Sequence, residues 1–280
     1  MRTTPFKAIL ISLFALTLAI SCAAASPVAA KATKRATPTL YIHGLQGSHK
    51  STDKLIKMTS KHGAKKVFTI NVQADGTLQT TGHYTRKSKV KHPLIQVNFE
   101  NNVAPVSTQT TWLTKVLTYL KQKKHVHNVN IVAHSAGNVT VLTTMSQTTV
   151  KLPKLKHYVD IAGPFDGVVG MNDTPNRNSL DANNRPKIFT TATNSYPSYQ
   201  SLIDTAKTFP KHARVLVLYG NLQDGTNSDG LVTTTSARSV NYLLQDRVKQ
   251  IKNVQMNHLT HSGLHNSKKV ARKIVHFLFK

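Results

Sequence analysis

The stretch Ile131–Asn138 reads IVAHSAGN, and it decides the expected fold. The apolar residues before the serine predict a buried strand, and Ala136–Thr149 is predicted to be a helix. Ser135 would then sit at a tight turn from strand to helix, which exposes its hydroxyl group above the sheet. Such a strained turn needs small residues two positions away on either side, and Ala133 and Gly137 meet this need. Ser135 is therefore a candidate nucleophile.

The turn departs from its usual pattern at one position. The common form is Gly-x-Ser-x-Gly, and here Ala133 replaces the first glycine while Gly137 keeps the second. The pattern is only moderately specific, so a serine in an ordinary loop is the alternative interpretation. The helix after Ser135 begins with unpaired amide groups that favour negative charge. We therefore expect the Ala136 N–H to face a developing oxyanion.

Short apolar runs alternate with helical patterns along most of the chain, which predicts an α/β fold. Besides the strand before Ser135, strands are predicted over Thr39–His43, Val67–Val72, Leu94–Phe99, Tyr158–Ala162, Arg214–Tyr219 and Val248–Met256. Further helices are predicted over Gln109–Lys123, Thr234–Gln245 and Ser267–Phe279. This order predicts a mostly parallel central sheet with helices on both faces, whose ligands bind beyond the carboxyl ends of the strands.

One segment breaks the alternation. Residues 165–211 are rich in Asn, Asp, Pro, Ser and Thr and are only weakly periodic. The segment lies between two strong predicted strands. We expect it to form an insertion, or cap, over the site.

A second loop follows the first core strand directly. His43 and Gly44 open this loop, and its backbone can turn another amide, that of Leu45, towards Ser135. Two amides, from Leu45 and Ala136, would form an oxyanion hole, in which one donor typically contributes about 3 kcal/mol to lowering the barrier. The alternative is an ordinary glycine turn, and His43 is interpreted as a structural residue of the loop.

A catalytic acid should follow a late strand, and two aspartates follow Arg214–Tyr219. Asp229 lies in the stretch SDGLV and Asp224 in another Asp-Gly turn. Either residue could simply form a turn, which is a common use of this dipeptide. Asp229 is the favoured acid because its turn leads into a helix.

The candidate base follows the last strand, where His258, His261 and His265 are close in sequence. A histidine here completes the chain order Ser, Asp, His that this kind of site uses. The histidine would take the proton of Ser135, and the aspartate would fix its tautomer. On one continuous helix the three imidazoles would share a face, so a metal site is the competing interpretation.

The excess of basic over acidic residues indicates which kinds of binding partner to expect. The chain has 37 Lys and Arg against 11 Asp and Glu, a formal net charge of +26. Such a charge attracts polyanions through salt-screened forces, so electrostatic association with an anionic cell wall or membrane surface is expected. We find no helix-turn-helix, zinc-finger or RNA-recognition pattern, and no specific nucleic-acid partner is expected. No cofactor or metal is needed for the expected chemistry.

The amino terminus resembles an export signal. Arg2 and Lys7 precede an apolar run over Ile9–Ile20, and small residues suitable for cleavage follow up to residue 30. We therefore expect a signal peptide over residues 1–30, a flexible lead-in over 31–38, and a secreted or cell-surface protein. An uncleaved anchor and lipidation of Cys22, the only cysteine, are the alternatives.

Taken together, these motifs resemble the α/β-hydrolase superfamily. More narrowly, the chain resembles the domain-of-unknown-function 915 family of Gram-positive cell-surface hydrolases. The matching pieces are His43-Gly44 with Ser48 and Ser51, HSAG at 134–137, IAGPFDG at 161–167, SDGLV at 228–232 and HSGLH at 261–265. The resemblance implies one hydrolase domain over residues 39–280, with Ser135, Asp229 and His261 as the triad and His265 outside it.

Two functions remain open at this point. The leading hypothesis is a serine esterase, lipase-like in its chemistry, that acts on a small-molecule or lipid ester through an acyl-enzyme. The alternative, motivated by the net charge of +26, is a catalytically idle hydrolase fold that binds an anionic cell-wall polymer.

Overall fold

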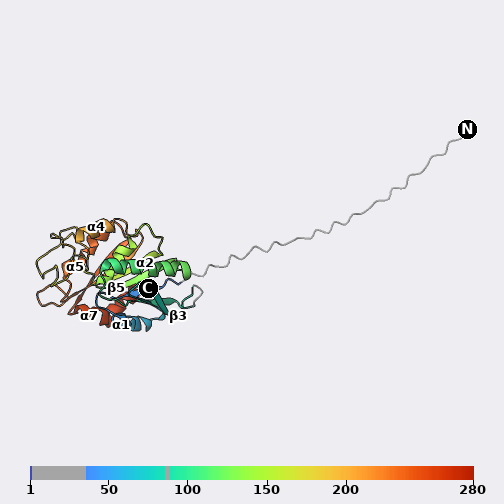
Figure 1. The fold of residues 1–280 in the computed structure, drawn as a ribbon, viewed down its shortest axis with the longest axis horizontal. Coiled ribbons are helices and arrows are strands. Elements are labelled where there is room, and N and C mark those ends of the chain that lie inside the picture. Colours follow the sequence, from blue (N-terminus) through green and yellow to red (C-terminus); the bar gives the residue numbers. More distant parts are fainter. Residues whose placement is uncertain (2–35, 86–88) are drawn as a thin grey trace. The chain divides into compact units, whose positions relative to one another are not determined.

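An eight-stranded sheet with the order β3-β2-β4-β1-β5-β6-β7-β8 forms the centre of the fold. The computed structural model describes residues 1, 36–85 and 89–280 (Figure 1). The predicted signal peptide, Cys22 and most of the predicted lead-in lie outside the described residues. Arg35–Lys280 forms one compact unit.

All neighbouring strands run parallel except β2 and β3, which pair antiparallel. The strands are β1 (Thr39–Ile42), β2 (Ala64–Val72), β3 (Leu78–Gly82), β4 (His92–Phe99), β5 (Asn128–His134), β6 (Lys154–Ile161), β7 (Arg214–Asn221) and β8 (Gln250–Asn257). The helices are α1 (His49–Ser60), α2 (Val106–Lys123), α3 (Ala136–Met145), α4 (Tyr199–Ala206), α5 (Thr234–Arg238), α6 (Val240–Leu244), α7 (His261–Asn266) and α8 (Lys268–Phe279). The α/β class and the mostly parallel sheet expected from the sequence are confirmed.

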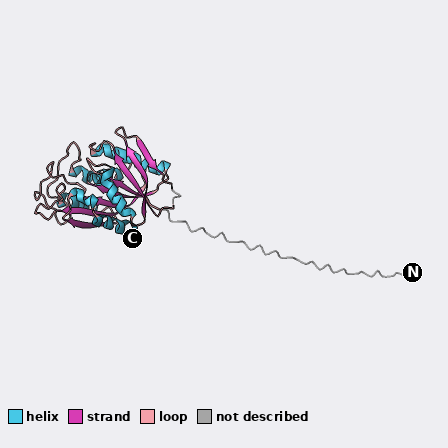
Figure 2. Cartoon of the chain, turned by 90° about the horizontal axis from the view of Figure 1, so that it is seen from below, coloured by secondary structure: helices cyan, strands magenta, loops and turns pink. Residues whose placement is uncertain are grey.

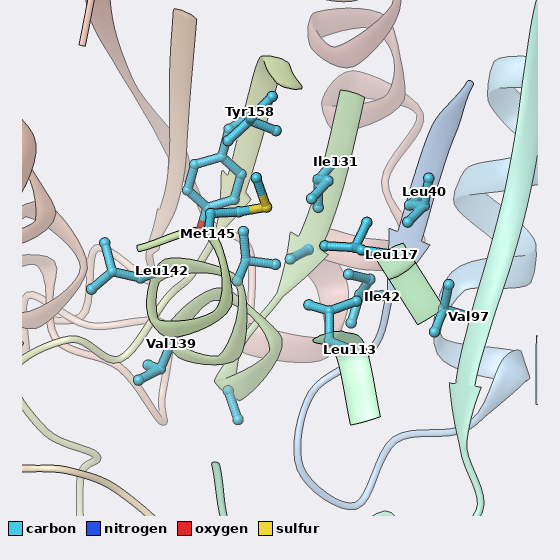
Figure 3. Close-up of a cluster of buried hydrophobic side chains, with 14 of the residues drawn as sticks. Leu40, Ile42, Val97, Leu113, Leu117, Ile131, Val139, Leu142, Met145 and Tyr158 are labelled. Carbon is cyan, nitrogen blue, oxygen red and sulfur yellow. The ribbon is translucent and has the colours of Figure 1, made fainter. Parts of the chain in front are cut away.

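Helices cover both faces of the sheet (Figure 2). On one face α2 and α3 pack Leu113, Leu117, Val139 and Leu142 against the strands, as Figure 3 shows. The other face is covered by α1, α7 and α8, whose apolar residues form a second buried cluster. The central strands are therefore buried on both sides, which explains their nearly continuous apolar sequences.

Several elements differ from the sequence predictions. Helix α1 and the edge strand β3 were not predicted, because α1 is largely polar and most of β3 is exposed. The predicted helix over Thr234–Gln245 is two short helices, α5 and α6, which meet at Ser239. The Ser239 hydroxyl donates to the Ser236 carbonyl (2.7 Å), and such local side-chain bonds compete with a continuous helix.

The connection from β6 to α4 spans residues 162–198 and contains only isolated bridges. It leaves the carboxyl end of β6, as expected for an insertion beside the site. None of the helices in the described ranges is long and apolar enough to cross a membrane.

Candidate active site

Ser135 occupies the turn between β5 and α3. Its backbone has φ 54° and ψ −132°, a strained conformation for a residue with a side chain. The turn is held by two hydrogen bonds, since Ser135 N–H donates to the Ile161 carbonyl (2.9 Å) and Asn138 N–H donates to the Ser135 carbonyl (2.9 Å). Ser135 therefore lies beyond the carboxyl end of the central strand β5, at the start of helix α3.

The loop after β1 packs closely against this turn. A Cβ atom on Gly44 would lie 2.6 Å from Ser135 Cβ, and one on Gly137 would lie 2.6 Å from the His43 carbonyl oxygen. Real Cβ atoms do not approach other atoms this closely. Glycine at these two positions therefore allows the backbone of the loop to touch the serine turn. Ala133, the departure from the common motif, is buried within β5 and is accommodated there.

His43 fixes the conformation of this loop. Phe99 N–H donates to His43 Nε2 (3.0 Å), and His43 Nδ1 donates to the Gly44 carbonyl (2.8 Å). Burial lowers the pKa of His43, which keeps the ring neutral and matches this arrangement of one acceptor and one donor. His43 thus organises the backbone beside Ser135 rather than acting on a substrate.

The amide of Ala136 follows the serine directly, and the amide of Leu45 follows Gly44 in the adjoining loop. The Cβ position of Gly44 is 3.2 Å from Ala136 N, so the loop adjoins the first turn of α3. Within the described residues, the amides of Leu45 and Ala136 donate no hydrogen bond. The neighbouring Gln46 is held in place, because its N–H donates to the Asn102 carbonyl (2.8 Å). Unpaired backbone amides are the kind of donor that can bind an oxyanion.

Asp229 and His261 form a buried hydrogen-bonded pair. His261 Nδ1 lies 2.9 Å from Asp229 Oδ2, and the two side chains are 10% and 1% exposed. Asp229 Oδ1 accepts from the amides of Leu231 (3.0 Å) and Val232 (2.8 Å). His261 N–H also donates to the Asp229 carbonyl (2.8 Å). The carboxylate is therefore fixed from both sides and orients the imidazole.

Gly220, near the end of β7, makes room for this pair. A Cβ on Gly220 would lie 2.6 Å from Asp229 Cβ and 2.8 Å from the Leu259 carbonyl oxygen. The loops carrying Asp229 and His261 thus meet at this glycine. Sequence reasoning did not identify this role of Gly220.

His134 connects His261 to the Ser135 turn. This residue precedes Ser135 directly, its Nε2 lies 3.1 Å from the His261 carbonyl oxygen, and its ring centroid is 4.6 Å from that of His261. Burial, followed by the neighbouring histidines, lowers the pKa of His134 well below 6.5. His134 is therefore neutral and donates to the carbonyl of His261. In the described structure no hydrogen bond joins the Ser135 hydroxyl to His261, and such bonds often form only in the substrate complex.

The alternative candidates Asp224, His258 and His265 lie in surroundings that differ from those of Asp229 and His261. Asp224 is exposed, and it accepts from the amide (3.0 Å) and the hydroxyl (2.6 Å) of Thr226, as a turn aspartate does. His258 is exposed, has φ 58° and precedes α7. The ring of His265 packs edge-on against His134, with 4.7 Å between centroids. Among these residues, only His261 is paired with a carboxylate.

The metal hypothesis required the three histidines to share one helix face. Helix α7 begins at His261, so His258 is not on it. In the described ranges no group of three or more His, Cys, Asp or Glu residues could hold a metal ion.

A family model described as "alpha/beta hydrolase of unknown function (DUF915)" matches residues 26–280. The chain belongs to this family. A search of curated proteins found no match. The membership agrees with the parallel sheet and the serine turn at its carboxyl edge.

Solved structures similar to this DUF915 protein share its fold. A gene product of Listeria innocua is 24% identical with a TM-score of 0.72, and the match covers 88% of this chain and 94% of that one. A candidate cell-surface hydrolase of Lactobacillus plantarum is 22% identical with a TM-score of 0.66, covering 86% and 89%. Lipase B of Aspergillus fumigatus is 11% identical with a TM-score of 0.52, covering 82% and 49%.

Other supporting residues of this DUF915 protein were also missed by sequence reasoning. The Asn138 amide donates to the Ile161 carbonyl (2.9 Å), which also accepts from Ser135 N–H, and the Tyr158 hydroxyl donates to Asn138 Oδ1 (2.9 Å). Asp160 is buried, and burial raises the pKa of its carboxyl well above the usual value. A polar Asn in the first turn of an apolar helix was the available signal for this buried network.

The insertion has its own buried carboxyl. Asp166 accepts from the amide (2.9 Å) and hydroxyl (3.0 Å) of Thr190 and from the Asn178 amide group (2.8 Å). Burial raises the pKa of Asp166 to about 6. These contacts hold together residues 166, 178 and 190 of the insertion, which lie outside regular secondary structure.

Proposed function

We propose that this α/β hydrolase is a serine hydrolase that cleaves carboxylic esters, with Ser135 as nucleophile, His261 as base and Asp229 as acid. The supporting observation is the buried Asp229–His261 pair, which contacts the strained Ser135 turn through His134. The strained backbone at Ser135, directly before the first turn of α3, supports the same assignment.

The proposed reaction has two halves. Ser135 Oγ attacks the ester carbonyl carbon, and its proton passes to His261 Nε2. The negative oxygen of the tetrahedral intermediate is held by the amides of Leu45 and Ala136. The C–O bond to the alcohol then breaks, and His261 returns the proton to the departing oxygen.

Water completes the cycle. It attacks the acyl-enzyme carbonyl while His261 takes its proton, and the second tetrahedral intermediate releases the carboxylic acid and restores the Ser135 hydroxyl. Asp229 holds His261 in the tautomer with a proton on Nδ1 and stabilises the imidazolium. No metal or cofactor takes part in the proposed chemistry.

The surroundings favour an ester with an apolar part. Apart from Met1, the large exposed hydrophobic side chains of the described residues are Val103, Met171, Ile188 and Leu231. All four lie on loops that leave the carboxyl ends of β4, β6 or β7, the edge of the sheet that carries Ser135. Met171 and Ile188 also line a cavity of about 300 Å³ in the insertion. Exposed apolar side chains gathered around a site are typical of a binding surface.

A fluorophosphonate probe tests the proposal directly. The proposal expects one covalent adduct per chain, found by peptide mass spectrometry on Ser135 and absent from Ser135→Ala. A panel of p-nitrophenyl esters of increasing chain length would then define the acyl preference. A folded protein that is neither labelled nor active on any ester would favour the alternative, an idle hydrolase fold that binds an anionic polymer.

The place of action is a separate proposal. The predicted export signal and the cell-surface name of the Lactobacillus plantarum relative support a secreted or surface-associated enzyme. Amino-terminal sequencing of the exported protein tests this, with a new terminus expected after Ala25 or Ala30.

A further inference from the structure

One of the two helical layers of this protein carries much more positive charge than the other. Helices α1 and α8 pack side by side, and α1 also packs against α7. Leu55 and Ile56 of α1 and Val270 and Ile274 of α8 point into the buried cluster beneath them. The opposite surfaces of the two helices face solvent.

Those outer surfaces are strongly basic. The exposed cations are Lys50, Lys54 and Lys57 on α1, and Lys268, Lys269, Arg272 and Lys273 on α8. Both helices are 12 residues long. The helices of the other layer, α2 to α6, are longer in total, yet their only Lys and Arg residues are Lys115, Lys121, Lys123 and Arg238. We call the outer surface of α1 and α8 the basic face.

Little negative charge compensates the basic face. Asp53 is the only carboxylate of its two helices, and it accepts hydrogen bonds from His49 (2.8 Å) and Gln96 (2.9 Å). None of the lysines and arginines on the basic face forms an ion pair within the described residues. Unpaired cations on one surface create a positive potential that attracts a polyanion.

The basic face has charge without exposed apolar groups. None of the large exposed hydrophobic side chains lies on α1 or α8. Phe279 stacks on His92 with 4.1 Å between centroids, and Phe277 packs edge-on against His157. A helix that enters a lipid surface needs exposed apolar residues, and single-stranded nucleic acid is usually held by exposed aromatic rings. The face therefore fits a hydrated polymer that is held by charge alone.

The side-chain types on the basic face indicate which anionic group it would bind. Six of the seven cations named above are lysines, and only Arg272 could form a planar, two-point contact with a carboxylate. Lysine binds phosphate as a compact point charge. We propose that the basic face binds a flexible linear polymer of alcohol units joined by phosphodiesters. Binding to this face does not require the proposed catalysis.

The basic face lies next to the helix that begins at His261, so binding there would place the polymer near the proposed active site. Helix α7 begins at His261 and packs against α1. A polymer lying on α1 and α8 would therefore pass beside the edge of the sheet that carries the active site. The enzyme would be retained where esters attached to such a polymer, or close to it, are present.

Two matched quadruple variants test the proposal. The first combines Lys50→Gln, Lys54→Gln, Lys269→Gln and Lys273→Gln on the basic face. The control combines Lys115→Gln, Lys123→Gln, Lys151→Gln and Lys211→Gln, which are exposed residues on or beside α2, α3 and α4. Both lose the same charge, and none of these lysines belongs to the proposed catalytic machinery.

The probe is a linear poly(glycerol phosphate), and its affinity is measured by biolayer interferometry from 50 to 300 mM salt. At about 100 mM salt the basic-face variant should bind at least ~10-fold more weakly than wild type, with a shallower salt dependence, because fewer counterions are released. The control should lose no more than about threefold. Equal losses in both variants, or no loss in the first, would overturn the proposal.

Two further probes address the other polyanions. Anionic phospholipid vesicles and a single-stranded oligonucleotide are offered at the same phosphate concentration. If the protein binds the vesicles and the oligonucleotide more weakly than poly(glycerol phosphate), the proposed polymer ligand is supported. If it binds either of them more tightly, and this binding is lost in the basic-face variant, the proposal is overturned in favour of lipid or nucleic acid. Unchanged circular dichroism confirms that the variants fold, and because the readout is binding, a failed esterase assay would not affect the result.

Discussion

The Asp229 carboxylate lies 2.9 Å from His261 Nδ1, and the amides of Leu231 and Val232 hold its other oxygen. The two residues are 32 positions apart in the chain. The close approach depends on Gly220, where any side chain would collide with Asp229. Because the contacts of Asp229 and His261 are so specific, substitution of either residue tests its proposed role.

Asp229→Asn should lower kcat for a p-nitrophenyl ester by up to about 10⁴-fold, because the amide stabilises the wrong tautomer of His261. His261→Ala should cost at least as much, since the serine and its base act as a unit. Steady-state kinetics check both. The matched controls Asp224→Asn and His265→Ala should keep most of the activity, and loss in His265→Ala with near-normal His261→Ala would reassign the base.

Ser135→Ala should lower esterase activity by at least about 10⁴-fold and abolish the acyl-enzyme, because no other group can form it. Rapid-quench measurement of the initial burst is the appropriate test. Ser135→Ala removes only the hydroxyl group and keeps the Cβ atom at the strained backbone, so its melting temperature should change little. Near-normal turnover in this variant would refute the proposed mechanism as a whole.

Gly44→Ala should lower activity sharply, because its Cβ would meet Ser135 Cβ at 2.6 Å and the His134 carbonyl oxygen at 2.9 Å. The loop would have to move away and carry the Leu45 amide with it. Since one oxyanion donor typically contributes about 3 kcal/mol, a loss of about 100-fold in kcat is expected.

Gly63→Ala is the control for this change. Gly63 has φ 84° and no atom within 4 Å of its Cβ position, so the substitution costs backbone strain of about 1 kcal/mol without touching the site. Its kcat should remain that of wild type. An active Gly44→Ala enzyme would remove the loop from the proposed oxyanion hole.

Stability should decrease in mild acid because of His134. Burial lowers its folded-state pKa well below 6.5, whereas the unfolded chain takes up a proton near the ordinary value. Unfolding therefore binds a proton as the pH falls below 6.5, and this ring reduces the free energy of unfolding by up to about 1.4 kcal/mol per pH unit.

Urea denaturation of wild type and His134→Gln between pH 6.5 and 5 measures this contribution. Glutamine can still donate to the His261 carbonyl but does not titrate, so the variant should show a weaker pH dependence. The exposed His212→Gln serves as the control. A slope that is identical in all three proteins would show that His134 is protonated in the folded state.

Local patterns predicted a large part of this molecule. The alternation of apolar runs and helical periods yielded the parallel sheet, because burial on both faces leaves continuous apolar strands in the sequence. The IVAHSAGN stretch predicted the Ser135 turn because a strand, a small-flanked serine and a helix are all encoded within a few neighbouring residues. Helix α1 and strand β3 were missed, because α1 is largely polar and most of β3 is exposed, so neither has a clear apolar pattern in the sequence.

The sequence by itself determined the fold class and a short list of candidates: one serine, two aspartates and three histidines. Only the tertiary structure decided which of them meet. The sequence favoured Asp229 and the family resemblance implied His261, but the pairing of these two side chains follows from where α7 begins and from the space left by Gly220. These distances join separate loops at the ends of different strands, and residue spacing along the chain does not contain them. The same reason applies to the basic face, because the lysines of α1 and α8 become one surface only when the two helices pack together.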